Sequence, residues 1–129
     1  MLELSVEFFP PKTGEGISRF KKAADALVPL GFGFASVTYG AGGSTREGTL
    51  SAARELKKRF REGVPHVSCY GSDEKSIHEL LKTYLNDGFS RLVILRGDLP
   101  SGYGGLGEWS WNGRPFIFSL LTKVIDTRF

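Results

Sequence analysis

The stretch FGFASVTYGAGGSTREGTLSAARELKKRFREGVPHVSCY, residues 32–70, contains a predicted strand, helix and second strand in succession, and this order indicates the fold class. Residues 32–40 form a short apolar and β-branched run that ends in glycine, which is typical of a buried strand. Residues 44–60 have a helical period, and one face of that helix carries Leu50, Ala53, Leu56 and Phe60. Residues 64–70 are again apolar and β-branched, which predicts the second strand.

The alternation of strand and helix continues in both directions. Residues 4–8 alternate apolar and polar side chains until Pro10 and Pro11 end the strand, and a helical pattern over 16–31 closes at Gly31. The patterns downstream predict a helix over 72–88, a strand over 91–98, a glycine-rich loop over 99–115 and a helix over 116–129. The two helices that flank the central unit are expected to bury Ile17, Phe20, Ala24, Leu27 and Val28, and Ile77, Leu80, Leu81, Tyr84 and Leu85, respectively.

Four strand–helix units in succession are typical of parallel α/β folds. An open doubly wound sheet and a (β/α)8 barrel both begin in this way. A complete barrel takes about 250 residues, so the 129 residues of this chain suffice for about half of one. The predicted fold class is therefore α/β: one domain over residues 1–129 that forms a partial (β/α)8 TIM barrel of about four βα units.

Strand alternation sorts the side chains of the four predicted strands onto two faces. The apolar face receives Leu4, Val6, Phe8, Ala35, Val37, Tyr39, Val67, Cys69, Val93 and Leu95. The other face receives Ser5, Glu7, Ser36, Thr38, His66, Ser68, Arg96 and Asp98. The charged members of this second set lie toward the carboxyl ends of the strands, where barrels and open α/β sheets place their active sites. We therefore expect a polar pocket there, with Glu7 on its rim.

Each of these polar residues also has a purely structural interpretation. Glu7 could pair with Lys12 or Arg96, and Arg96 and Asp98 could form an ion pair with each other. His66 could be a hydrogen-bonded core histidine. Neither of the two histidines has companions at metal-ligand spacing, so no metal site is expected.

Composition restricts the class of protein. Seventeen Lys and Arg against fourteen Asp and Glu leave a net charge of +3, and the basic run at 55–62 is typical of a solvated helix face, so no nucleic-acid partner is expected. The single cysteine, Cys69, excludes an intrachain disulfide and is expected to be a buried, inert thiol in a reducing compartment. No apolar run approaches the roughly 20 residues that span a bilayer, and the N-terminus lacks a signal-peptide layout. These features predict a cytoplasmic protein without membrane contact.

Four segments resemble the successive signature segments of the methylenetetrahydrofolate reductase family: VEFFPPKT (6–13), FASVTYGAGGSTRE (34–47), PHVSC (65–69) and LVILRGDLP (92–100). They occur in the family's order, and the resemblance covers residues 3 to about 108. It implies a (β/α)8 barrel that binds FAD tightly but noncovalently. It also implies ping-pong reduction of 5,10-methylenetetrahydrofolate to 5-methyltetrahydrofolate by NADH or NADPH, for methionine synthesis.

The resemblance also implies roles for individual residues. Glu7 matches the general acid that assists opening of the folate's five-membered ring, a role that a dry site would favour because it keeps the acid protonated. The flavin contacts implied are Thr38, Tyr39, Ala41, His66, Arg96, Gly97 and Asp98. Asp98 also faces the folate pterin, so Glu7 and Asp98 are the expected catalytic and substrate-binding residues.

The resemblance weakens beyond Glu108, and residues 109–129 do not follow the family's usual continuation closely. Further flavin, folate and nicotinamide contacts are expected in the second half of such a barrel. Two alternatives therefore stay open: an inactive half-barrel that binds FAD weakly, and one that forms a homo-oligomer through its exposed edge strands. A different barrel enzyme of one-carbon metabolism is a third.

Overall fold

The computed structural model describes residues 2–39, 46–69 and 72–95. The elements in chain order are β1 (Ser5–Phe8), α1 (Gly14–Leu27), the 3-10 turn η1 (Val28–Leu30), β2 (Phe34–Val37), α2 (Arg46–Lys57), β3 (Gly63–Ser68), α3 (Glu74–Asn86) and β4 (Val93–Leu95). The predicted alternation of strands and helices is confirmed as far as β4. The glycine-rich loop and last helix that the sequence predicts lie outside the described residues.

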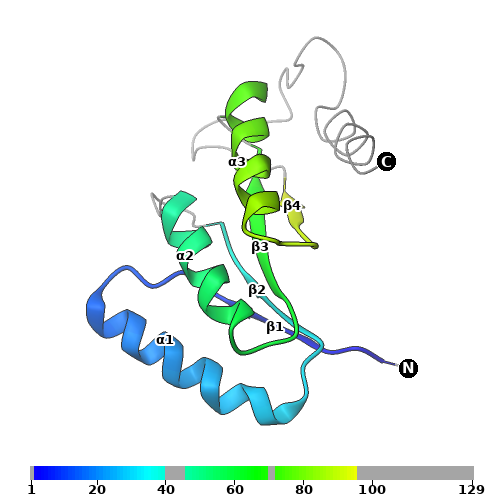
Figure 1. Cartoon of the computed structure of the whole chain (residues 1–129). Helices are drawn as coiled ribbons and strands as arrows, with labels where there is room; N and C mark the ends of the chain where they lie inside the picture. Colours follow the sequence, from blue (N-terminus) through cyan, green and yellow to red (C-terminus); the bar gives the residue numbers. More distant parts are fainter. Residues whose placement is uncertain (1, 40–45, 70–71, 96–129) are drawn as a thin grey trace, which may run out of the picture.

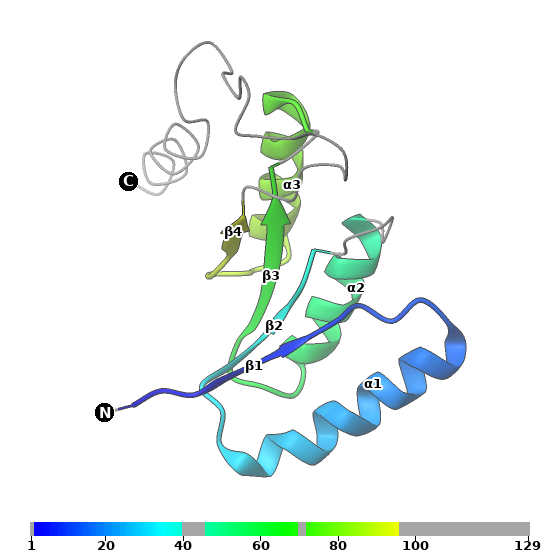
Figure 2. The ribbon, with the colours of Figure 1, turned by 180° about the vertical axis from the view of Figure 1, so that it is seen from behind.

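The four strands form one parallel sheet in the order β1-β2-β3-β4. The helices α1, α2 and α3 all cover the same face of this sheet: Figure 1 looks onto the helices, and Figure 2, from behind, shows the strands in front of them. The predicted parallel α/β arrangement is therefore confirmed. In the described part of the chain, β1 and β4 are the two edge strands.

The hydrophobic core lies between the sheet and the three helices. Strand alternation directs the side chains of Phe8, Ala35, Val37 and Val67 toward the helices, and all of them are buried, as expected. The Phe8 ring packs edge-on against Phe20 of α1, with ring centroids 5.2 Å apart. The helices and their connections add Ala24, Ala52, Ala53, Leu56, Phe60, Ile77, Leu80, Leu81, Tyr84 and Phe89 to this core. Leu4, predicted on the same face, is 57% exposed because it precedes β1.

The register of β4 differs from the expectation. His66 pairs with Val93, Val67 with Ile94 and Ser68 with Leu95. Paired residues of parallel strands share a face, so Val93 and Leu95 lie on the face away from the helices, whereas Ile94 packs against the core. The prediction that Val93 and Leu95 face the helices is therefore wrong. Every residue from 92 to 95 is apolar, so alternation carried no information about this strand.

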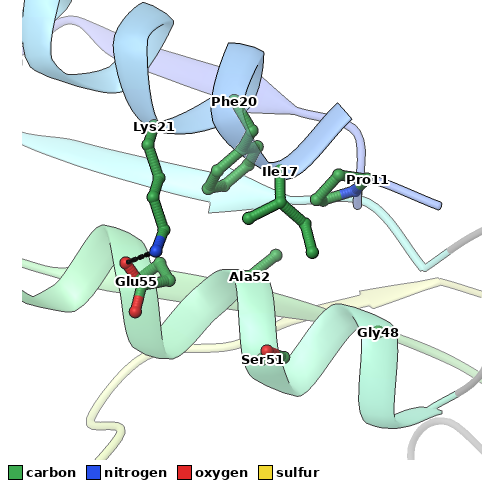
Figure 3. Close-up of a pocket in the computed structure, with 8 residues that line it drawn as sticks. All are labelled: Pro11, Ile17, Phe20, Lys21, Gly48, Ser51, Ala52 and Glu55. Atoms are coloured by element: carbon green, nitrogen blue, oxygen red, sulfur yellow. Dashed lines mark ion pairs between the residues drawn. The ribbon is translucent and has the colours of Figure 1, made fainter. Parts of the chain in front are cut away.

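Three helical side chains predicted to be buried are exposed: Ile17, Val28 and Leu85. Ile17 lines the open pocket between α1 and α2 (Figure 3), so solvent reaches it there. Leu85 belongs to α3, an outer helix of the row whose described neighbour, α2, lies on one side only (Figure 1). Val28 is the first residue of the 3-10 turn η1, so its side chain does not continue the apolar face of α1. The sequence predicts that Gly31 closes the helix itself, but α1 ends at Leu27 and Gly31 ends the 3-10 turn that follows, with a left-handed φ of 73° that suits glycine.

Strand β3 contains a proline although it lies between β2 and β4. Proline cannot donate a hydrogen bond to a neighbouring strand. The described β3–β4 ladder begins at His66, one residue after Pro65. Cys69 N–H donates to Leu95 O at 3.0 Å, and the backbone N–H groups of a strand point alternately to its two sides. The nitrogen of Pro65, four residues earlier, therefore points toward β4, at a position before that ladder starts. The proline therefore occupies a position where no ladder donor is needed.

Candidate functional site

Glu7, Ser36 and His66 lie on neighbouring strands, on the face of the sheet away from the helices. Glu7 pairs with Ser36 in the register of β1 and β2, and Ser36 pairs with Val64, two residues before His66. The Oε2 atom of Glu7 lies 3.5 Å from Nε2 of His66, so the two side chains meet across β2. The structure thus brings together the acid and the histidine that the sequence placed on one face.

His66 is a buried, neutral imidazole. Its exposed fraction is 5%, and burial lowers its pKa from the usual 6.5, with the nearby Glu7 carboxylate acting in the opposite direction. Neither ring nitrogen has a hydrogen-bond partner among the described residues. The 3.5 Å contact with Glu7 is therefore a close approach rather than an ion pair. The expected alternative of a hydrogen-bonded core histidine does not describe this side chain.

Glu7 itself is largely open to solvent, with 54% of its side chain exposed. The described residues therefore do not supply the dry environment expected for the general acid. No ion pair joins Glu7 to Lys12 within the described segments, so that structural interpretation of the carboxylate finds no support. The other expected partner, Arg96, lies outside them.

Thr38 and Tyr39 follow β2 at its carboxyl end and face opposite sides. Thr38 N–H donates to Phe8 O at 2.9 Å, and Thr49 Oγ1 donates to Thr38 O at 3.1 Å. The Oγ1 atom of Thr38 is buried without a partner in the described structure. The Tyr39 ring packs against the core on the helix side, and its hydroxyl accepts a hydrogen bond from Arg46 Nε at 3.4 Å. On the face of the sheet away from the described helices, Tyr39 can therefore offer its backbone but not its ring.

The remaining predicted site residues, Ala41, Arg96, Gly97 and Asp98, lie outside the described residues. Their roles stay predictions, as do those of Glu7, Thr38, Tyr39 and His66.

Two residues near the strand ends were missed by the sequence reasoning. Thr49, fully buried, hydrogen-bonds the backbone of Thr38 from α2. Arg46 opens α2 and bridges Tyr39, Ser72 and Ser76. A signal for Arg46 was present, because a cation in the first turn of a helix opposes the helix dipole and calls for a specific partner.

The unpartnered polar atoms fit the flavin that the resemblance implies. Native proteins seldom leave buried polar atoms without a hydrogen bond. Among the described residues, the buried unpartnered side-chain atoms are Oγ1 of Thr38, both ring nitrogens of His66 and the hydroxyl of Tyr84. Thr38 and His66 are two of the expected flavin contacts, and both lie toward the carboxyl ends of their strands. A polar ring system lying on this edge could complete their hydrogen bonds.

Other kinds of site find no support in the part of the chain that the structure describes. No cluster of three or more His, Cys, Asp or Glu there could hold a metal ion, and no described helix is long and apolar enough to cross a membrane. A cavity of about 320 Å³ lies between α1 and α2, on the helix side of the sheet, and none of the predicted site residues lines it (Figure 3).

Comparisons with known proteins agree with the sequence resemblance. A family profile described as methylenetetrahydrofolate reductase matches residues 2–115. The 5,10-methylenetetrahydrofolate reductase of Escherichia coli is 38% identical over 126 residues, which are 97% of this chain and 41% of that protein. The enzyme of the same name from Salmonella typhimurium is 38% identical over 104 residues, 80% of this chain and 35% of the relative. Methylenetetrahydrofolate reductase (NADH) 1 of Zea mays is 36% identical over 99 residues, 76% of this chain and 17% of the relative. The chain spans about two fifths of the length of its bacterial relatives.

Proposed function

The chain belongs to the methylenetetrahydrofolate reductase family, and from this premise we propose that it forms the first half of a flavin-dependent (β/α)8 barrel. The proposed reaction is the reduction of 5,10-methylenetetrahydrofolate to 5-methyltetrahydrofolate by NADH or NADPH in the cytoplasm. All three helices of the described residues lie on one face of the sheet, which supports a barrel wall, because a doubly wound sheet carries helices on both faces. The proposed site lies at the carboxyl edge of the sheet.

The observation that carries this proposal is the group of unsatisfied atoms on the face of the sheet away from the described helices. Thr38 Oγ1 and the ring nitrogens of His66 are buried and unpartnered in the described structure, and the Glu7 carboxylate lies 3.5 Å from the same histidine. The residues that would hold FAD are Thr38 and His66 through their side chains and Tyr39 through its backbone. When bound, FAD would supply the hydride transfer between nicotinamide and folate.

The chain's own residues would handle orientation and the proton. His66 is neutral because burial lowers its pKa, so it can donate one hydrogen bond and accept another without placing a charge beside the cofactor. Glu7 would protonate a ring nitrogen of the folate as its five-membered ring opens. The half-exposed carboxylate lets the proton be replaced from solvent.

Separate measurements of the two half-reactions test this function. Glu7→Gln keeps the shape of the side chain but has no acidic proton. In the FAD-loaded protein, the variant is expected to accept hydride from NADH at the rate of the unaltered chain, while oxidation by 5,10-methylenetetrahydrofolate falls by about 100-fold or more. Equal losses in both half-reactions would contradict the assignment of Glu7 as the folate acid.

A second candidate function is self-association. Both outer strands of the described sheet, β1 and β4, have one side without a neighbouring strand, and an unpaired edge is a template for another chain. Three apolar side chains next to β1 in the sequence are also exposed: Leu2, Leu4 and Phe9. A homo-oligomer would elute from a sizing column at a volume that depends on protein concentration, whereas a chain that acts only as a monomer would not.

A further inference from the structure

Arg46 connects three separate segments at the carboxyl edge of the sheet. Its Nε donates to the hydroxyl of Tyr39 at 3.4 Å, its Nη2 to Oγ of Ser72 at 3.1 Å and its Nη1 to the backbone oxygen of Ser76 at 3.3 Å. Tyr39 follows β2, Ser72 lies between β3 and α3, and Ser76 lies in the first turn of α3. One guanidinium therefore ties the end of β2 to the start of α3.

The position of Arg46 is unfavourable unless these bonds are made. It is the first residue of α2, where the helix dipole repels a cation. Its side chain is half-buried. The Asp73 carboxylate, whose pKa is lowered first by hydrogen bonds from Ser76 and also by the charge of Arg46, offsets part of the repulsion from the dipole, although no direct ion pair joins Asp73 and Arg46 within the described ranges. The planar fork of arginine reaches acceptors in three directions at once, which the single ammonium of lysine cannot do in the same geometry.

The segments that Arg46 joins carry the polar atoms of the proposed site. Tyr39 directly follows Thr38, whose Oγ1 is unpartnered in the described structure. Ser72 N–H donates to Cys69 O at 3.4 Å, and Cys69 is three residues after His66 in the same run of chain. A shift of either segment would change the separation between Thr38 and His66.

We propose that Arg46 is a positioning residue that fixes the ends of β2 and β3 in the arrangement that receives the flavin. It acts through Tyr39, Ser72 and Ser76 and does not itself touch the cofactor. This inference rests on the proposed function, because the arrangement matters for FAD only if FAD binds there. Groups that orient the residues around a bound metal typically change its affinity on the order of 10- to 100-fold, and we expect an effect of the same order on flavin binding.

Equilibrium titration with FAD, followed by flavin fluorescence, tests the proposal. Arg46→Lys and Arg46→Gln are both expected to weaken FAD binding on the order of tenfold. The matched control is Arg54→Lys in the same helix, because Arg54 pairs with Asp87 at 2.7 Å, away from the strand ends, and its replacement should leave the affinity unchanged. If Arg46→Lys binds FAD as the unaltered chain does, charge alone suffices and the proposal is overturned.

Amide hydrogen exchange in the protein without FAD separates this inference from the proposed function. The amides of Thr38 and Cys69 are hydrogen-bonded at the strand ends, and that of Ala35, which donates to Glu62 O, is bonded at the other end of β2. Arg46→Lys should speed exchange at Thr38 and Cys69 on the order of tenfold, with Ala35 unchanged. Unchanged exchange at all three amides would overturn the positioning role even if the unaltered chain retains no FAD. Faster exchange in a chain that retains no FAD would support the role and contradict the proposed function.

Discussion

Gly63, the first residue of β3, allows α2 to pack directly against the sheet. A Cβ atom at this position would lie 2.6 Å from Ala53 O and 2.8 Å from Lys57 N, both backbone atoms of α2. Backbone atoms cannot rotate away, so the helix would have to retreat by about 0.8 Å to restore the 3.4 Å of ordinary contact. The replacement Gly63→Ala therefore tests how tightly the sheet and the helix layer are joined.

The expected cost of Gly63→Ala is about 1–3 kcal/mol in the free energy of unfolding, the usual range for overpacking a filled core. At roughly 4 °C per kcal/mol for a chain of this size, the Tm should fall by about 4–12 °C. Thermal unfolding followed by far-ultraviolet circular dichroism measures this shift, and urea unfolding gives the free energy directly.

Gly14→Ala is the matched control. Gly14 is the first residue of α1 and a Cβ there would meet nothing within 4 Å, so the replacement should leave the Tm unchanged or raise it by the equivalent of about 0.4–1 kcal/mol. If Gly63→Ala unfolds at the same temperature as the unaltered chain, α2 does not lie against β3 as described, and the reasoning is refuted.

Three further predictions concern titration and reactivity. Because the Glu7 carboxylate raises the pKa of His66 against the effect of burial, Glu7→Gln should lower that pKa further in an NMR titration. An unchanged His66 pKa would show that the two side chains do not meet. The folded state resists protonation of His66, whereas in the unfolded state this histidine takes up a proton near pH 6.5. The free energy of unfolding should therefore decrease as pH falls from 6.5 toward the lowered pKa of the folded state, and His66→Gln should flatten this decrease in urea unfolding. Identical slopes for the two proteins would contradict burial of a neutral imidazole. Cys69 is 3% exposed and burial raises the pKa of its thiol, so a thiol reagent should label it only as fast as the chain opens, whereas rapid labelling of the folded protein would place the thiol at the surface.

Much of the fold could be predicted because the order of polar and apolar residues in the sequence agrees with which side chains the structure buries. Pro10 and Gly31 end elements for local backbone reasons, and the clear alternation around Glu7 and His66 placed both residues on one face. The pattern failed where that agreement was missing. The uniformly apolar run of β4 fits either register, and only pairing with β3 decides that Ile94 faces the core.

The candidate site was predicted less completely because it depends on contacts between distant segments. Alternation could place Glu7 and His66 on the same face but not at 3.5 Å from each other. The helical period could not show that Arg46 reaches Ser72 and Ser76, 26 and 30 positions further along the chain. The lack of hydrogen-bond partners for Thr38 and His66 is likewise a property of packing, which no local pattern contains.

Retention of FAD by the protein shows whether this edge of the sheet holds the cofactor. The chain is mixed with FAD and desalted, and its visible absorption spectrum is recorded beside that of a Thr38→Val, His66→Phe double variant, which lacks the unpartnered polar atoms. We expect a flavin band that stays with the unaltered protein and is lost from the variant. A colourless unaltered protein, or equal retention by both, would contradict the claim that this sheet edge holds the cofactor.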